Sequence, residues 1–305
     1  MAKNRRIRKI VRSKPTIEGA GVHLHRAFGS GEVPDLDPFL LLDDFRATDP
    51  RFYIKGFPWH PHRGIETITY VLEGRVEHGD SMGNEGVIGV GDVQWMTAGS
   101  GIIHQEMPKG DGKGHMGGFQ LWANLPASHK MMEPRYRGLT KAEIPEVPLG
   151  GGVTVRIICG EVKDTRGPVR DIVTDPEYFD VSISPNSRFV HPVKRGHTAF
   201  AYVIEGHGLF CDETNPFTYE MEGQNYFDME RNPSIGNNSL VLFNDGDQIL
   251  VSTESESVRF LLISGKPIGE PVAWYGPIVM NTQEELRIAF DEYRSGTFIK
   301  HRGNR

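Results

Sequence analysis

Short runs of β-branched and aromatic residues, separated by glycine-rich turns, recur along most of the sequence and constrain its fold most strongly. The longest run, IETITYVLEGRV at 65–76, ends at a Glu-Gly pair. Regularly punctuated short strands are typical of β-sandwiches and barrels. The 36 glycines and 20 prolines among the 305 residues suit the many turns that such a fold needs. We therefore predict an all-β protein. Similar runs lie at 153–158, 179–183, 199–204, 239–243, 248–252 and 258–263.

A faint internal repeat indicates how these strands are grouped. ETITYVLEG at 66–74 and TAFAYVIEG at 198–206 align their tyrosine, glutamate and closing glycine, 132 residues apart. That separation is about one domain, so duplication of a barrel is the simplest explanation. Prolines and glycines concentrate at 134–152, which we take as the linker. We predict two tandem barrels, 1–140 and 150–305.

One helix is expected, near the C-terminus. Thr282 is a suitable N-cap, and Glu284 and Glu285 would stabilise the first turn of LRIAFDEYR. Its apolar stripe of Leu286, Ala289, Phe290 and Tyr293 must pack on something. We assign this helix to the second domain and expect it to pack on a barrel of the same chain.

Charge and cysteine content favour a cytoplasmic protein without nucleic-acid partners. The formal net charge is −6, and no apolar run is long enough for a membrane span or a signal peptide. Cys159 and Cys211 are the only cysteines, which argues against a disulfide framework or a thiolate zinc site. The N-terminal stretch of 3–14 is basic: it either contacts nucleic acid or acidic membranes, or forms an amphipathic edge strand with Ile7 and Ile10. We favour the edge strand.

Two His-containing pairs form a candidate metal site. His60 and His62 are two residues apart, and His104 and Glu106 repeat that spacing. In a strand, residues i and i+2 point to the same face, so two neighbouring strands could direct three imidazoles and one carboxylate at one ion. Imidazole suits iron, zinc, copper and nickel, and a carboxylate favours the harder ions. The pair His23 and His25 has no matching second pair, so we expect it on the surface.

The surroundings of these residues resemble the cupin superfamily. The first cupin motif is seen as His60-x-His62-x3-Glu66 followed by Gly74, and the second as Gly91-x5-Thr97-x-Gly99-x4-His104. Longer segments resemble the pirin family more specifically and span nearly the whole chain. These segments are PFLLLDDF at 38–45, HPHRGIETITYVLEG at 60–74, HGDSMGNEGVIGVGDVQWMTAGSGIIHQE at 78–106, GGFQLWANLP at 117–126 and GKPIGEPVAWYGPIVMNTQEEL at 265–286.

The resemblance implies two jelly-roll-like cupin barrels, of which only the first holds a metal. The implied ligands are His60, His62, His104 and Glu106, with Glu66 on the same face but not bound to the ion. In the second repeat, Pro192 and Lys194 stand at the positions of His60 and His62, so that barrel is expected to be metal-free. His197 is off-register and is more plausible as a packed or surface histidine.

The pirin resemblance implies two functions, and the wider cupin resemblance leaves a third, in decreasing order of preference. The first is a mononuclear Fe(II) dioxygenase that opens flavonols such as quercetin with O2, with Glu106 as the catalytic proton acceptor. The second is a non-catalytic iron-binding regulator that contacts a transcription factor or a metabolic enzyme, and the third is zinc-dependent sugar-phosphate isomerisation. Zn, Mn, Ni, Co or Cu could replace the iron. Candidate lining residues for an aromatic substrate, each more often plain core, are Phe57, Trp59, Trp95, Met96 and Phe119.

Overall fold

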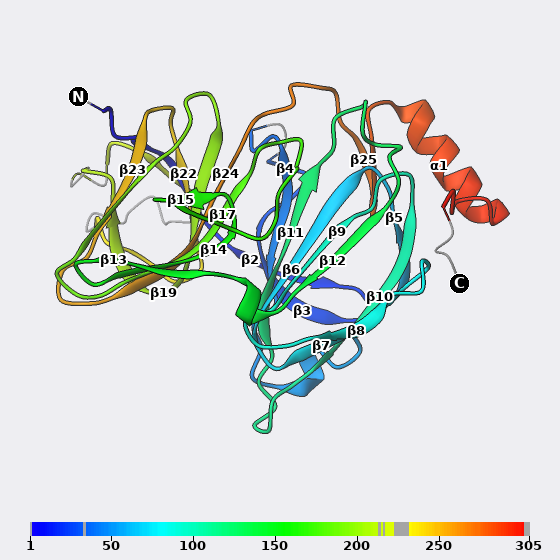
Figure 1. Ribbon diagram of the computed structural model, residues 1–305, viewed down its shortest axis with the longest axis horizontal. Helices are drawn as coiled ribbons and strands as arrows, with labels where there is room; N and C mark the ends of the chain where they lie inside the picture. The colour runs from blue at the N-terminus through cyan, green and yellow to red at the C-terminus, as the bar shows by residue number, and fades with distance from the viewer. Residues whose placement is uncertain (1, 33–34, 213–214, 216, 223–231, 302–305) are drawn as a thin grey trace. The chain divides into compact units, whose positions relative to one another are not determined.

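The described residues form β-strands, two short 3-10 helices (Pro50–Phe52 and Lys141–Glu143) and one α-helix, which confirms the predicted all-β class (Figure 1). The computed structural model describes residues 2–32, 35–212, 215, 217–222 and 232–301. The chain divides into two compact units. We call Pro15–Glu143 with Ile268–Arg305 the N-barrel, and Met1–Lys14 with Ile144–Pro267 the C-barrel.

The N-barrel contains a seven-stranded sheet of order β12-β9-β6-β11-β4-β3-β2 and a four-stranded sheet of order β5-β10-β7-β8. Strand β6 is the predicted 65–76 run, and it is buried on both faces along most of its length. The strands are β2 (Lys14–Glu18), β3 (Val22–Phe28), β4 (Phe39–Asp44), β5 (Phe57–His62), β6 (Ile65–Glu73), β7 (Arg75–Asp80), β8 (Glu85–Ile88), β9 (Val93–Thr97), β10 (Ile102–Lys109), β11 (Gly117–Asn124), β12 (Arg135–Leu139), β25 (Ala273–Tyr275) and β26 (Ile278–Met280).

The C-barrel contains an 11-stranded sheet with the path β13-β14-β17-β24-β19-β22-β1-β20, and β18, β21 and β23 pair off this path. Its described interior contains a large apolar cluster that includes Phe179, Phe189, Phe210 and Phe260. The strands are β1 (Ile7–Arg12), β13 (Glu146–Gly150), β14 (Val153–Cys159), β15 (Glu161–Val162), β16 (Thr165–Arg166), β17 (Glu177–Ile183), β18 (Arg188–Pro192), β19 (Thr198–Phe210), β20 (Glu220–Glu222), β21 (Ile235–Gly236), β22 (Ser239–Phe243), β23 (Gln248–Ser252) and β24 (Val258–Gly265).

Each end of the chain belongs to the other barrel from the one expected when the domains were placed at 1–140 and 150–305. The break at Glu143/Ile144 lies between those boundaries, but β1 belongs to the C-barrel and α1 (Gln283–Ser295) to the N-barrel. Strand β1 pairs with β22 and also with β20, so it is an inner strand and not the expected edge strand. The reason is burial: Ile7 and Ile10 are part of the C-barrel core.

The C-terminal helix begins and ends where its sequence indicates. The Thr282 side chain accepts from the Glu285 backbone N–H, the Glu285 side chain accepts in return, and Gly296 ends the helix in a left-handed conformation. Leu286 and Ala289 pack in a cluster with Ile278 of β26. The helix therefore packs on its own chain, as expected, although on the N-barrel segment.

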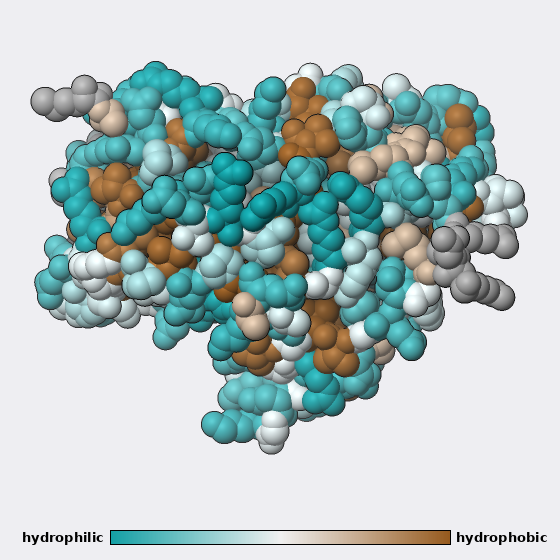
Figure 2. Space-filling view, viewed as in Figure 1, coloured by the Kyte–Doolittle hydropathy of each residue, from teal (hydrophilic) through white to brown (hydrophobic). Residues whose placement is uncertain are grey.

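The surface seen in Figure 2 is mostly hydrophilic, with apolar side chains in separate patches. Among the described residues, no helix has the length and apolar character needed to cross a membrane.

Candidate metal centre

The three histidines of the predicted site come from two paired strands of the N-barrel. Strands β5 and β10 are antiparallel, with His60 directly opposite His104 and His62 opposite Ile102. Burial alternates along β10, so His104 and Glu106 face inward while their neighbours are less buried. The i,i+2 spacing thus places these side chains on one face, as predicted.

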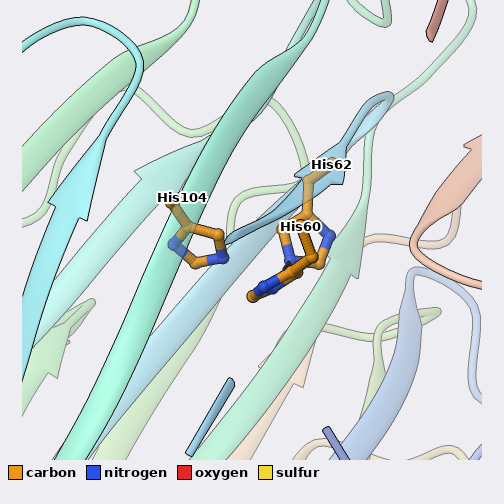
Figure 3. A group of neighbouring side chains, drawn as sticks. All are labelled: His60, His62 and His104. Atoms are coloured by element: carbon orange, nitrogen blue, oxygen red, sulfur yellow. Dashed lines mark hydrogen bonds between the residues drawn. The ribbon is translucent and has the colours of Figure 1, made fainter. Parts of the chain in front are cut away.

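The imidazoles converge on one point, as Figure 3 shows. One ring nitrogen from each of His60, His62 and His104 lies within 4.8 Å of the other two. The Nε2 atoms of His60 and His62 are 3.0 Å apart. Within the part of the chain that the structure describes, this is the only such group of three potential metal ligands.

Backbone carbonyls determine which ring nitrogens carry protons. His60 Nδ1 lies 2.8 Å from the Pro58 carbonyl oxygen, and His62 Nδ1 lies 3.1 Å from the Pro277 carbonyl oxygen. Because a carbonyl oxygen can only accept, both Nδ1 atoms donate and both Nε2 atoms carry lone pairs. Two lone pairs facing each other at 3.0 Å repel unless a cation lies between them.

His104 supplies a third unsatisfied nitrogen. Its Nε2 is buried and has no hydrogen-bond partner. Burial lowers the pKa of His60, and it lowers the pKa of His62 and His104 well below the ordinary value, so all three rings are neutral at neutral pH. Neutral, inward-facing imidazoles are the form that binds a transition metal, so the donor set fits one ion.

Glu106 lies apart from this group in the structure. Its carboxylate is buried, and Thr69 Oγ1 donates to Oε1 at 2.8 Å. Burial raises the pKa of Glu106 to about 7, although the Thr69 bond opposes that rise. Glu106 as a fourth ligand therefore remains a prediction.

Glu66 does not occupy the position that we expected. It is three residues from Thr69 in β6, so the two side chains lie on opposite faces of the strand. Thr97 Oγ1 donates to Glu66 Oε1 at 2.7 Å. The alternation of side chains along a strand cannot be extended from His62 to Glu66, because the chain turns between β5 and β6.

Two buried basic side chains stabilise the turn that follows His62. The Arg63 side chain donates to the carbonyls of Ser100 and Phe298 and pairs with Glu292 of α1 at 2.8 Å. Lys130 Nζ donates to the Gly64 carbonyl at 2.9 Å. The exchanged C-terminal segment thereby supports the metal-centre strand, and Pro277 also orients His62.

A cavity of about 690 Å³ opens on the metal centre. Its walls include His60, His62 and Glu106, and its size falls in the usual range for small-molecule sites. Of the lining residues expected from sequence, only Phe57 is in the wall; Trp95, Met96 and Phe119 are core residues and Trp59 is exposed. Sequence reasoning missed the remaining wall, which includes Arg26, Asp43, Gln120, Trp122 and Trp274.

Sequence comparison identifies the family. The pirin family model matches residues 21–123, and the model of the pirin C-terminal cupin domain matches residues 178–299. A pirin-like protein of Caulobacter vibrioides is 43% identical over 295 residues, which cover 96% of this chain and 99% of that protein. This chain belongs to the pirin family.

Other pirin relatives carry enzyme names. A Pseudomonas aeruginosa protein, provisionally named a quercetin 2,3-dioxygenase, is 39% identical over 97% of this chain and 99% of its own length. The crystal structure of a quercetin 2,3-dioxygenase from Acinetobacter baumannii superposes with a TM-score of 0.84 at 28% identity, covering 97% of this chain and 99% of that one. The two predicted cupin barrels are thus confirmed for this pirin.

The remaining histidines of interest lie elsewhere. His23 is exposed and contacts the Phe52 ring at a centroid distance of 4.7 Å. In the C-barrel, His197 is near Asp175 at 3.8 Å, and Pro192 closes β18. That the C-barrel of this pirin binds no metal remains a prediction.

Proposed function

We propose that this protein is a metal-dependent dioxygenase that opens the heterocycle of flavonols such as quercetin. The observation that carries the proposal is the cavity of about 690 Å³, whose wall contains both the imidazoles and an apolar aromatic surface. A planar polyphenol fits such a site, because its faces are apolar and its edge carries hydroxyls. Relatives with quercetin dioxygenase names support the same activity.

The proposed ligands are His60, His62, His104 and Glu106, around one mononuclear ion. The first three already converge, and Glu106 lies in the same cavity wall. Three imidazoles with one carboxylate suit Fe(II), although Zn, Mn, Ni, Co or Cu could bind as well. Bound Fe(II) would supply the one-electron chemistry that lets O2 react with a closed-shell flavonol.

Glu106 is the proposed proton acceptor. Thr69 donates one hydrogen bond to Oε1, so the two carboxylate oxygens keep lone pairs both for the ion and for the proton of the flavonol 3-hydroxyl. Burial raises the pKa of Glu106, which makes this carboxylate a better proton acceptor than an exposed one. The resulting flavonol anion is the electron-rich form that ring opening requires.

The apolar walls position the substrate and exclude water. Phe57, Trp122 and Trp274 line the cavity, and the Trp122 ring contacts His62 at a centroid distance of 5.0 Å. An aromatic substrate held against these rings would lie next to the imidazoles. Positioning of this kind is a large part of catalysis when two substrates must meet.

The test is anaerobic reconstitution with Fe(II), followed by quercetin and then O2. We expect loss of flavonol absorbance together with release of carbon monoxide, in proportion to bound iron. The matched control is His62→Ala protein treated in the same way. If fully iron-loaded protein consumes no quercetin and releases no carbon monoxide, the enzyme proposal fails and the non-catalytic iron-binding regulator is the better explanation.

A further inference from the structure

A row of polar side chains crosses the inner face of the larger N-barrel sheet. Each member is the cross-strand partner of the next, from β3 through β4, β11 and β6 to β9. Polar side chains at successive inward positions are unusual in a barrel, because such positions normally form the core. The row consists of Arg26, Asp43, Gln120, Thr69 and Gln94.

Hydrogen bonds connect this row to Glu106. Thr69 Oγ1 lies 2.8 Å from Glu106 Oε1 and 2.6 Å from Gln120 Oε1. A hydroxyl has one proton, so it donates to Glu106 and accepts from the Gln120 amide once that amide is turned. Four members of the row, all except Gln94, line the cavity.

The far end of the row is an ion pair. Arg26 donates to both carboxylate oxygens of Asp43, through Nε at 2.8 Å and Nη2 at 2.7 Å. Its Nη1 pairs with Glu18 at 2.9 Å, and Glu18 also lines the cavity. Two carboxylates thus face one guanidinium, which leaves an excess of negative charge at this end.

Apolar residues flank the row on both sides. On one side, Leu24 and Phe45 lie two residues along their strands from Arg26 and Asp43. On the other side, Leu41 and Trp122 lie two residues from Asp43 and Gln120. All four line the cavity. The surface therefore presents hydrocarbon on both sides of a line of hydrogen-bonding groups, which matches a flat aromatic molecule with polar groups on its edge.

The charge at the far end determines which polar groups fit. Each Asp43 oxygen accepts one bond from Arg26 and keeps a second lone pair. A carboxylate or phosphate on the ligand would be repelled, whereas a phenolic hydroxyl could donate. Asp43 is two strand spacings from Thr69, about 10 Å, which is comparable with the length of a flavonol.

We infer that Asp43, oriented by Arg26, is a specificity-determining residue that accepts hydrogen bonds from ring hydroxyls of the substrate at the end remote from the metal centre. This inference rests on the proposed function, because it takes the cavity as the substrate site. It adds a substrate class: flavonols with free hydroxyls beyond the 3-hydroxyl, in preference to unsubstituted, carboxylated or phosphorylated ones.

The test compares the binding of quercetin with that of 3-hydroxyflavone, which keeps the 3-hydroxyl and lacks all others. Binding is measured without O2 by quenching of tryptophan fluorescence, since Trp122 and Trp274 line the cavity. We expect the wild-type protein to prefer quercetin and Asp43→Asn to reduce that preference about tenfold, because a charge-assisted bond is replaced by a neutral one.

Asp44→Asn is the matched control. Asp44 is also a buried carboxylate of β4 paired with an arginine, Arg46, but it faces the other side of the strand and does not line the cavity. We expect this variant to keep the wild-type preference. An equal change in both variants, an unchanged preference in Asp43→Asn, or the absence of binding by either flavonol would overturn the inference.

A second variant covers the case in which Asp43→Asn does not fold. Gln120→Met removes one polar member of the row at similar volume, and we expect it to lower the preference about threefold. Binding and turnover separate the two proposals. An Asp43-dependent preference without carbon monoxide release would retain this inference and reject the enzyme, whereas turnover with an unchanged preference would do the reverse.

Discussion

Corresponding strands of the two barrels pair in the same register, but the inward-facing side chains along that register differ in polarity. The internal repeat aligns Thr69 of β6 with Ala201 of β19. Following cross-strand partners from Ala201 gives a row that corresponds, strand by strand, to the polar row of the N-barrel. Every member of this C-barrel row is apolar and buried: Ile157, Phe179, Leu262, Ala201 and Val241.

This difference shows how one barrel design serves two purposes. In the C-barrel, hydrocarbon fills the interior, and each fully buried large side chain contributes about 1.5–3 kcal/mol to the free energy of folding. In the N-barrel, the same inward positions hold polar groups beside a cavity and the histidines. We conclude that the interior of the N-barrel is less completely packed because it contains the cavity and the metal centre, whereas the interior of the C-barrel is a packed apolar core.

The sharpest way to test this division is removal of one imidazole from each barrel. We expect His62→Ala to weaken metal binding by at least about 100-fold, because it removes one of the converging ligands. His197→Ala should leave metal content unchanged. Element analysis of the purified variants measures both, and metal loss in the His197 variant would place a ligand in the C-barrel.

Exchanging residues between corresponding positions of the rows tests the packing difference. Leu262→Gln buries an amide in a filled interior and should lower the free energy of unfolding by about 2–4 kcal/mol. Gln120→Leu, at the corresponding position beside the cavity, should change it by less than about 1 kcal/mol. Urea unfolding gives both values, and equal losses would show that the two interiors are packed alike.

Glu106→Gln examines the buried carboxylate in the wall of the N-barrel cavity. We expect metal affinity to fall about tenfold while the three imidazoles retain some binding, since the variant removes a negative ligand and a base. Turnover of quercetin should fall further than metal content does. Unchanged turnover at equal metal loading would remove Glu106 from the role of proton acceptor.

The smallest expected effect is the pH dependence of the preference for quercetin over 3-hydroxyflavone. Burial raises the pKa of Asp43 to about 6, against the opposing effect of Arg26, and Glu18 and Asp44 raise it further. The carboxylate is therefore charged above about pH 6, and the preference should decline as the pH falls through that value. Asp43→Asn has no group that titrates there and supplies the baseline. A decline of equal size in the variant would assign the effect to the ligand.

Much of the fold could be predicted because its causes are local. Alternating β-branched runs indicated the strands, and Thr282 with Glu285 indicated the start of the helix, since capping depends on residues three apart. The convergence of His60 and His62 follows from the side-chain period of a strand. The repeated spacing at His104 and Glu106 indicated a second strand beside the first, and the pairing of β5 with β10 brings His104 opposite His60.

Other features depend on contacts between distant parts of the chain. The exchanged chain ends, the Pro277 carbonyl at His62 and the Trp274 wall all come from segments far from the metal-centre strands in sequence. The acidic pair in FLLLDDF was visible as polar residues in an otherwise buried strand, but nothing local indicated its partners.

By itself, the sequence determined the secondary structure, the helix cap and the spacing of the paired histidines, because each depends on interactions within a few residues. Only the tertiary structure decided that Arg26, Asp43, Gln120 and Thr69 form one continuous row. The physical reason is strand register: which side chains become neighbours across a sheet depends on hydrogen bonds between strands far apart in the chain, and a shift of one residue would turn the row to the other face.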